Sequence, residues 1–246
     1  MQQELRTGHG TSSQNFRIVA ENQDGTPSSA FYTYAEEVAI EQFIGRPIKE
    51  DVKAKATKWG NLMECVVFNA LPMGYELCHK LTVVHKKYGH IWSGTPDLLS
   101  DLKVGEIKCF WVKQFVLFSL ALLSGDIERV KREFPGPYWQ IVGNAILTKK
   151  KYAELIAFLP TKEQLRTVLD AVENTDFLKD FGLDESDYFH FRVENIEQFP
   201  YLPDNCGIDP VNTFEFEVPF EDKIFLTKKY IDFDKEVKRV LATFKQ

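Results

Sequence analysis

The residues with the clearest chemical potential lie in the stretch PDLLSDLKVGEIK, at positions 96–108. Asp97 follows a proline, and nine residues later Glu106 stands two positions before Lys108. Side chains alternate along a β-strand, so Glu106 and Lys108 point to one face while Ile107 points to the other, into the core. If Asp97 lies on the neighbouring strand and faces the same way, two carboxylates can bind one divalent cation, with the lysine beside them.

Two carboxylates, water and a cation form a hard oxygen site, which suits Mg²⁺ or Mn²⁺. Such a metal lowers the pKa of a bound water and stabilises negative charge on a phosphate. The same short pattern also fits an ordinary hairpin, in which residues 100–103 form the turn and Glu106 and Lys108 lie on a solvated strand face. The pattern alone leaves both readings open.

The elements expected around this stretch favour the metal site. Residues 75–84 alternate and are rich in β-formers, residues 90–94 return as a second strand, and residues 104–109 form a third. A three-strand meander of this kind places the two carboxylates on adjacent strands.

Helical and strand patterns continue along the rest of the chain. Helical periodicity predicts helices at residues 33–43, 53–71, 110–123, 138–147, 161–172 and 232–244. Further strands are expected at residues 152–159, 188–193 and 214–218. This mixture predicts an α/β fold, with a central mixed β-sheet flanked by helices. The helix at 110–123 is apolar nearly all round, which predicts that it is buried.

The chain length of 246 residues indicates one large domain. Residues 1–30 are polar and predict a flexible N-terminal arm. Residues 31–246 are expected to form a single domain, in which the acidic stretch 174–210 is an insertion. No apolar run approaches the roughly 18 residues of a membrane span, and no secretory signal is evident. We therefore expect a soluble, cytoplasmic protein, located in the host cytoplasm if it is viral.

The cysteine spacing and the charge distribution limit the kinds of functional site that the chain can form. The four cysteines have no CxxC or zinc-finger spacing, so we expect free thiols. The net charge of −6 is unusual for a nucleic-acid-binding domain. A nuclease nevertheless needs only local positive potential. Lysines cluster at positions 53, 55 and 58, at 86 and 87, at 149–151, and at 228 and 229. Each cluster is either a phosphate-binding track or a solvated face.

Four short motifs occur in one order along the chain: Gly60-x-x-x-Glu64, Thr95-Pro96-Asp97, Glu106-Ile107-Lys108-Cys109 and Tyr138-Trp139-Gln140. This series resembles the phage lambda exonuclease and YqaJ-type viral recombinase branch of the PD-(D/E)xK nuclease superfamily. The resemblance covers roughly residues 55–160 and implies a restriction-endonuclease-like core. Leu98 stands where the family often has glycine, and Phe110 where it often has proline.

The resemblance implies a role for each motif. The metal ligands would be Asp97, Glu106, Glu64 and the backbone carbonyl of Ile107. Lys108 would position the attacking water or stabilise charge on the phosphate, and Gln140 would orient Lys108 or the scissile phosphate. The implied cofactor is Mg²⁺, with Mn²⁺ as the alternative.

The implied activity is 5′-to-3′ digestion of double-stranded DNA ends, which makes single strands for recombination. The implied partners are double-stranded DNA, a single-strand annealing or recombination protein, and further copies of the chain, since ring-shaped trimers occur in that branch. An endonuclease of the same fold, of the restriction or junction-resolving type, is the enzymatic alternative. A non-catalytic DNA-binding or assembly module and a chance match to the motifs are the others.

Overall fold

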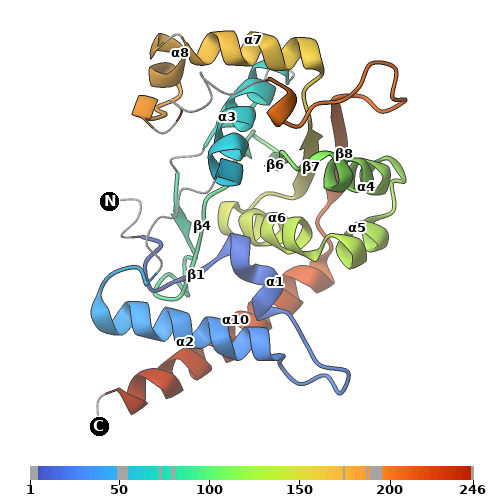
Figure 1. The fold of residues 1–246 in the computed structure, drawn as a ribbon. Coiled ribbons are helices and arrows are strands. Elements are labelled where there is room, and N and C mark those ends of the chain that lie inside the picture. Colours follow the sequence, from blue (N-terminus) through green and yellow to red (C-terminus); the bar gives the residue numbers. More distant parts are fainter. Residues whose placement is uncertain are drawn as a thin grey trace.

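A five-stranded mixed sheet forms the centre of the computed structural model, which describes residues 5–48, 55–71, 74–78, 81–173, 175–186, 188 and 196–244 (Figure 1). In spatial order its strands are β2 (Glu76–Leu77), β5 (Leu98–Leu99), β6 (Lys103–Lys108), β7 (Tyr152–Phe158) and β8 (Val211–Glu217). β6 and β7 are parallel, and the other neighbouring pairs are antiparallel. The predicted α/β fold with a central mixed sheet is confirmed.

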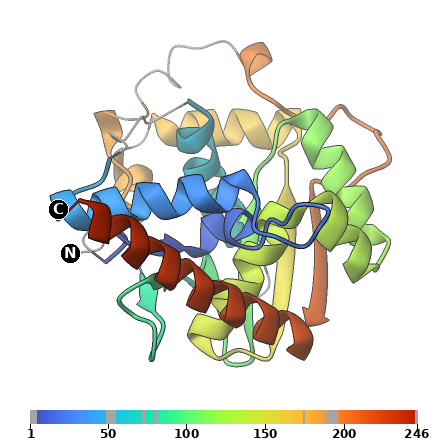
Figure 2. The ribbon, with the colours of Figure 1, turned by 90° about the horizontal axis from the view of Figure 1, so that it is seen from below.

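Helices cover both faces of this sheet. One face packs against α4 (Val112–Leu123) and α6 (Pro135–Thr148), and the same hydrophobic core continues to α5 (Ile127–Glu133), α2 (Ser29–Ile44) and α10 (Phe220–Thr243). The other face packs against α3 (Lys55–Ala70), α7 (Lys162–Val172) and α8 (Thr175–Asp180). The period of two along β7 divides the strand between two hydrophobic cores, because Ala153 and Leu155 face the first group of helices while Ile156 and Phe158 face the second. α2 and α10 lie against each other beneath the sheet (Figure 2).

The predicted three-strand meander is divided between two sheets. β3 (Val83–Val84) pairs antiparallel with β4 (Trp92–Gly94), which also pairs in parallel with β1 (Gly10–Thr11) in a small separate sheet. The expected strand at 75–84 therefore contributes β2 to the large sheet and β3 to the small one, and its residues 79–80 lie outside the described residues. The sequence analysis did not predict β5, which is only two residues long.

The N-terminal segment differs most from its prediction as a flexible arm. Its residues form β1, η1 (Ser12–Gln14) and α1 (Asn15–Ile18). The Asn15 side chain is fully buried, donates to the Trp139 carbonyl at 2.9 Å and accepts from the Tyr230 hydroxyl at 2.8 Å. Gly143 on α6 permits this approach, because a Cβ there would lie 2.1 Å from Asn15 Nδ2. Buried polar contacts thus hold this segment against α6 and α10, although its sequence has no apolar periodicity.

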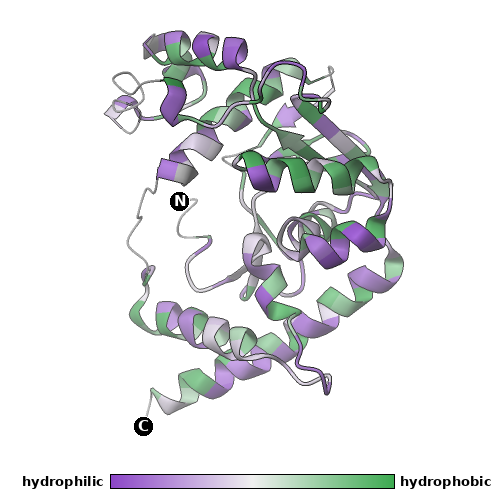
Figure 3. Cartoon of the chain, turned by 45° about the vertical axis from the view of Figure 1, so that its right-hand side comes forward, coloured by the Kyte–Doolittle hydropathy of each residue, from purple (hydrophilic) through white to green (hydrophobic). Residues whose placement is uncertain are grey.

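Two predicted helices also differ from the structure. α10 begins at Phe220, twelve residues before its predicted start at 232. α4 is not buried all round, since Leu117, Leu120 and Leu123 are between 44% and 60% exposed. Its strongly hydrophobic character is visible in Figure 3. The apolar composition correctly indicated that α4 packs against the core. It did not show which side of the helix is buried and which is exposed.

The remaining predicted elements appear with small shifts at their ends. The cap expected at Thr161 is present as a capping box with Gln164 at the start of α7. The acidic stretch 174–210 contains α8 and η2 (Ile196–Gln198), and the strand expected at 188–193 lies, apart from residue 188, outside the described residues. The four cysteines, all in the described ranges, are thiols rather than disulfides, as expected. Among the described helices, none has the length and apolar character needed to cross a membrane.

Replacing Asn15 by Ala should lower the free energy of unfolding by about 2–3 kcal/mol, because a buried carbonyl and a buried hydroxyl each lose their partner. Urea denaturation measures the change. The matched control is Asn22→Ala, since the Asn22 amide makes only exposed hydrogen bonds and its loss should cost no more than about 0.5 kcal/mol. Equal effects of the two substitutions would contradict the docking of the N-terminal segment.

Candidate active site

The sheet register places Asp97 and Glu106 opposite each other. Leu98 pairs with Gly105 and Leu99 with Val104, so one further step of this antiparallel register sets residue 97 across from residue 106. Asp97 Oδ2 accepts a hydrogen bond from the Ile107 backbone N–H at 2.8 Å. The expected placement of the two carboxylates on adjacent chain segments therefore holds. Their role as metal ligands stays a prediction.

Glu106 is completely buried at the centre of the sheet. Its Oε1 accepts from Lys108 Nζ at 2.7 Å and its Oε2 accepts from Asn144 Nδ2 at 3.2 Å. Burial and the negative charge of Asp97 raise the pKa of Glu106 to about 8, although Lys108 opposes the shift. The alternative of a solvated strand face is wrong, while Ile107 points into the opposite core as predicted.

Lys108 is held between the sheet and α6. Its Nζ donates both to Glu106 and, at 3.1 Å, to Gln140 Oε1. Burial by itself would lower the pKa of Lys108, but the carboxylates of Glu106 and Asp97 raise it overall. Lys108 is therefore a fixed positive charge rather than a base. Gln140 contacts Lys108 directly, while the orienting role that the motif implied stays a prediction.

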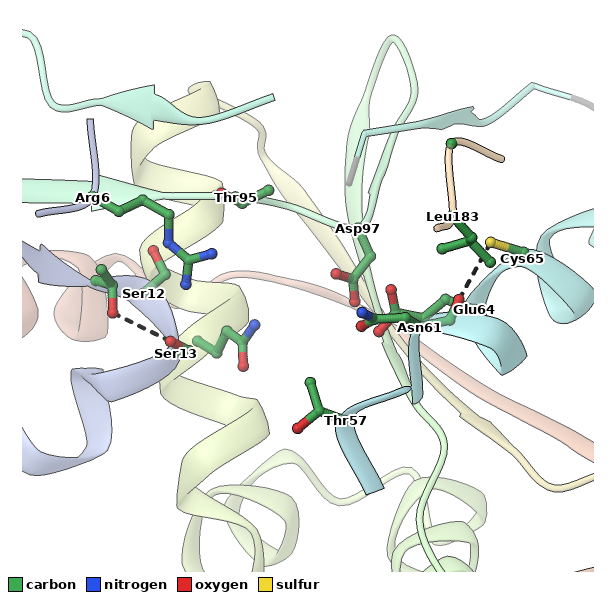
Figure 4. Close-up of a pocket in the computed structure, with 13 residues that line it drawn as sticks. Arg6, Ser12, Ser13, Thr57, Asn61, Glu64, Cys65, Thr95, Asp97 and Leu183 are labelled. Atoms are coloured by element: carbon green, nitrogen blue, oxygen red, sulfur yellow. Dashed lines mark hydrogen bonds between the residues drawn. The ribbon is translucent and has the colours of Figure 1, made fainter. Parts of the chain in front are cut away.

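Glu64 reaches the same region from α3. Burial raises its pKa well above the ordinary value, and the negative charges of Asp97 and Glu106 raise it further, against the effect of Lys108. Figure 4 shows Glu64, Asp97 and Asn61 close together on one wall of a cavity of about 440 Å³. All the predicted site side chains are thus brought to one place.

The opposite wall of this cavity comes from the N-terminal segment, which sequence reasoning missed. Arg6, Thr11, Ser12 and Ser13 line it, and Figure 4 shows Arg6, Ser12 and Ser13 on the side of the cavity opposite Asp97 and Glu64. The available signal was the series Arg-Thr-Gly-His-Gly-Thr-Ser-Ser at residues 6–13, which combines a cation with several hydroxyl groups. The same polar composition is also typical of a disordered segment, so it did not distinguish a cavity wall from a flexible arm.

The donor set fits a divalent cation. The negative charges of Asp97 and Glu106 raise the pKa of Glu64, and that of Asp97 raises the pKa of Glu106, while Lys108 supplies only one compensating charge. Oxygen donors with surplus negative charge suit Mg²⁺ or Mn²⁺. Among the described residues, no three His, Cys, Asp or Glu side chains stand close enough to form a complete site on their own. Water and the Ile107 carbonyl would therefore have to complete the ligand set.

Comparison of the sequence with protein-family models and with curated protein sequences finds no match. Solved structures do match over nearly their whole length. The alkaline exonuclease LHK-Exo from Laribacter hongkongensis, in complex with dAMP, has a TM-score of 0.64 and 13% identity, covering 99% of this chain and 95% of that chain. Another LHK-Exo structure has a TM-score of 0.61 and 14% identity, covering 98% and 93%.

A phage-related exonuclease from Haemophilus somnus 129PT is also similar, with a TM-score of 0.58 and 13% identity, covering 98% of this chain and 99% of that chain. At these identities the likeness establishes the fold. The chain has the fold of these exonucleases, which agrees with the restriction-endonuclease-like core that the motifs implied.

Replacing Glu64 by Gln should stabilise the metal-free protein at neutral and higher pH. Folded Glu64 keeps its proton to a higher pH than in the unfolded chain, where the carboxyl ionises near its ordinary pKa of 4.5. The wild-type free energy of unfolding should therefore fall as the pH rises above this value, and the variant should lose part of that fall. Urea unfolding in EDTA at about pH 5 and about pH 8 measures both.

Glu36→Gln provides the control for this prediction, because Glu36 is an exposed glutamate on α2. It should keep the wild-type pH dependence. A Glu64→Gln protein with an unchanged pH dependence would show that Glu64 carries no burial penalty in the metal-free state.

Millimolar Mg²⁺ should raise the melting temperature of the wild type by several degrees, since a ligand that binds only the folded state stabilises it. The Asp97→Asn protein should show little of this rise, because it loses a charged ligand. Calorimetric melting with Mg²⁺ and with EDTA gives the result without any assay of activity. An equal rise in both proteins would place the metal away from Asp97.

Proposed function

We propose that the protein is a metal-dependent deoxyribonuclease that digests double-stranded DNA from its ends in the 5′-to-3′ direction. The observation that carries the proposal is the arrangement of Asp97, Glu106 and Lys108 around β6, in which Glu106 is buried against Lys108 and Asp97 lines an open cavity. The fold shared with exonucleases supports the same conclusion. LHK-Exo binds dAMP, a deoxynucleotide, which supports DNA as the substrate class here.

The ligands proposed for the cation are Asp97, Glu106 and the Ile107 carbonyl, with Glu64 binding it directly or through a water. When bound, Mg²⁺ or Mn²⁺ supplies a water of lowered pKa and offsets the charge of the scissile phosphate. Lys108 remains protonated beside the carboxylates and donates a hydrogen bond to a phosphate oxygen, where negative charge grows during hydrolysis.

The opposite wall of the cavity favours an end of DNA over continuous duplex. Arg6 is a permanent cation with several donors, and the hydroxyls of Thr11 and Ser13 lie on the same wall. These groups suit the oxygens of a strand-end phosphate. A volume of about 440 Å³ is in the range of small-molecule pockets, so it fits a terminal nucleotide rather than an intact duplex.

The proposal extends to the partners of the reaction. An enzyme that removes one strand from a DNA end leaves a single strand, which a single-strand annealing or recombination protein would take up in the cytoplasm. Assembly into a homo-oligomer is the arrangement that the lambda exonuclease resemblance implies.

The purified protein with Mg²⁺ should degrade linear double-stranded DNA and leave a closed circle intact. Asp97→Ala should lose at least about 1,000-fold in rate, because the metal's charge stabilisation is lost. Gel electrophoresis of both substrates measures the result. Cutting of the circle would favour the endonuclease of the same fold, and DNA binding without cleavage would favour the non-catalytic module.

Replacing Lys108 by Ala should lower kcat about 100- to 1,000-fold at a temperature where melting shows the variant to be folded, since one preorganised donor to the reacting phosphate is removed. The matched control is Lys113→Ala, at an exposed position on α4, which should keep kcat near the wild-type value. Release of labelled nucleotides from linear DNA gives the rates. Full activity in Lys108→Ala would rule out this role.

A further inference from the structure

Four lysines gather at the other end of the sheet from the candidate active site. Lys149, Lys150, Lys151 and Lys223 line a second cavity of about 340 Å³, together with Thr227. The first three follow the C-terminal end of α6, and Lys223 lies in the first turn of α10, which starts beside that turn of the chain (Figure 2). α6 links the two regions, because Gln140 and Lys149 are nine positions apart, or about 13 Å along the helix.

This cluster has a local excess of positive charge. In the ranges that the structure describes, Glu217 is the one carboxylate that pairs with any of the four lysines, at 3.1 Å from Lys151. Lys150 donates to the backbone carbonyl of Asp101, which carries no net charge. The C-terminal end of α6 offsets only about half a charge. An excess of more than two positive charges therefore remains in a chain whose net charge is −6.

The lowered pKa of Lys223 indicates that positive charge in the cluster is not fully compensated. The residue is half-buried, and burial lowers its pKa. Glu217 partly offsets this effect, while the charge of Lys151 lowers the pKa further. An anion bound between these lysines would remove the repulsion.

An exposed aromatic ring lies one helical turn from Lys223 on α10. Phe220 begins α10 one turn before Lys223, and its side chain is 69% exposed, the highest value among the exposed aromatic residues of the described ranges. Ile224 follows one turn later and is 39% exposed. A phenylalanine this open to water has its ring face free to stack on a ligand.

We propose that the surface formed by Lys149, Lys150, Lys151, Lys223 and Phe220 binds single-stranded DNA. Lysines that follow a phosphate backbone, with an aromatic ring on which an unpaired base stacks, are the general features of single-strand binding. A duplex can use the lysines, but its paired bases are not available to the ring. This inference rests on the proposed function, because a nuclease that digests one strand leaves the other unpaired.

Fluorescence anisotropy with a labelled oligo-dT of about 20 nucleotides tests the surface, with metal-free protein in EDTA so that no cleavage occurs. The double variant Lys149→Ala, Lys223→Ala should bind about tenfold more weakly. Its slope of log K against log salt should be shallower by about 1.4, which corresponds to two lost phosphate contacts. The control Lys235→Ala, at an exposed lysine paired with Asp232 on α10, should bind like the wild type.

Substitutions of Phe220 distinguish stacking on a base from nonspecific hydrophobic binding. Phe220→Ala and Phe220→Leu should each weaken binding about tenfold, whereas Phe220→Trp should keep the wild-type affinity. Phe43→Ala, at another exposed phenylalanine, is the control and should have no effect. Thermal melting of every variant shows that the fold is retained.

Three outcomes would overturn the inference. The first is unchanged oligo-dT binding in the Lys149/Lys223 and Phe220 variants. The second is an equal Phe220-dependent loss for a blunt duplex of the same length, which would remove the single-strand assignment. The third is Phe220-dependent binding to phosphatidylserine vesicles without oligo-dT binding, which would assign the surface to a membrane.

The inference and the proposed function can fail separately. A wild type that degrades linear duplex with Mg²⁺ while the surface variants bind oligo-dT normally would overturn the inference alone. A wild type that binds oligo-dT through this surface but degrades no DNA would support the inference and overturn the proposed nuclease.

Discussion

The burial of Glu106 is the constraint on which the rest of the structure depends. A carboxylate without solvent at the centre of a sheet is costly unless it is paired and hydrogen-bonded. Lys108 pairs with it from the same strand, while Asn144 must come from α6. That requirement fixes α6 across β6 and brings Gln140 to Lys108. One buried carboxyl group and its hydrogen bonds thus link β6, α6 and Lys108.

The same helix carries the second wall of the cavity. Asn15 bonds to the Trp139 carbonyl on α6 and to Tyr230 on α10, which places the N-terminal segment opposite the acidic residues. His9 adds contacts from its ring to the carbonyls of Thr7 and Gly89. The hydrogen bonds that stabilise the docked N-terminal segment therefore also fix the shape of the cavity. A wall built from a terminal segment needs such anchors, because termini otherwise fray.

The positions of the candidate active-site residues were predicted from the sequence more accurately than the elements that support them. Alternation along β6 gave the opposite directions of Glu106 and Ile107, since the period of a strand is independent of its surroundings. The docking of the N-terminal segment was missed because hydrogen bonds between buried polar groups leave no periodic signal. The two-residue β5 is too short for a pattern, and the first half of α10 mixes Phe220 and Ile224 with charged residues on an exposed face. These features depend on tertiary contacts that a local pattern does not contain.

Charge separation connects the two regions of the molecule. Cleavage at Glu64, Asp97 and Glu106 would depend on a bound cation, which supplies the activated water and offsets the charge of the phosphate. The lysines at the far end of α6 have no such requirement. In a protein of net charge −6, they would attract nucleic acid at all times and raise its local concentration. A strand held there lies about 13 Å from Gln140 along the helix, so metal-independent binding and metal-dependent cleavage can act on one molecule of DNA.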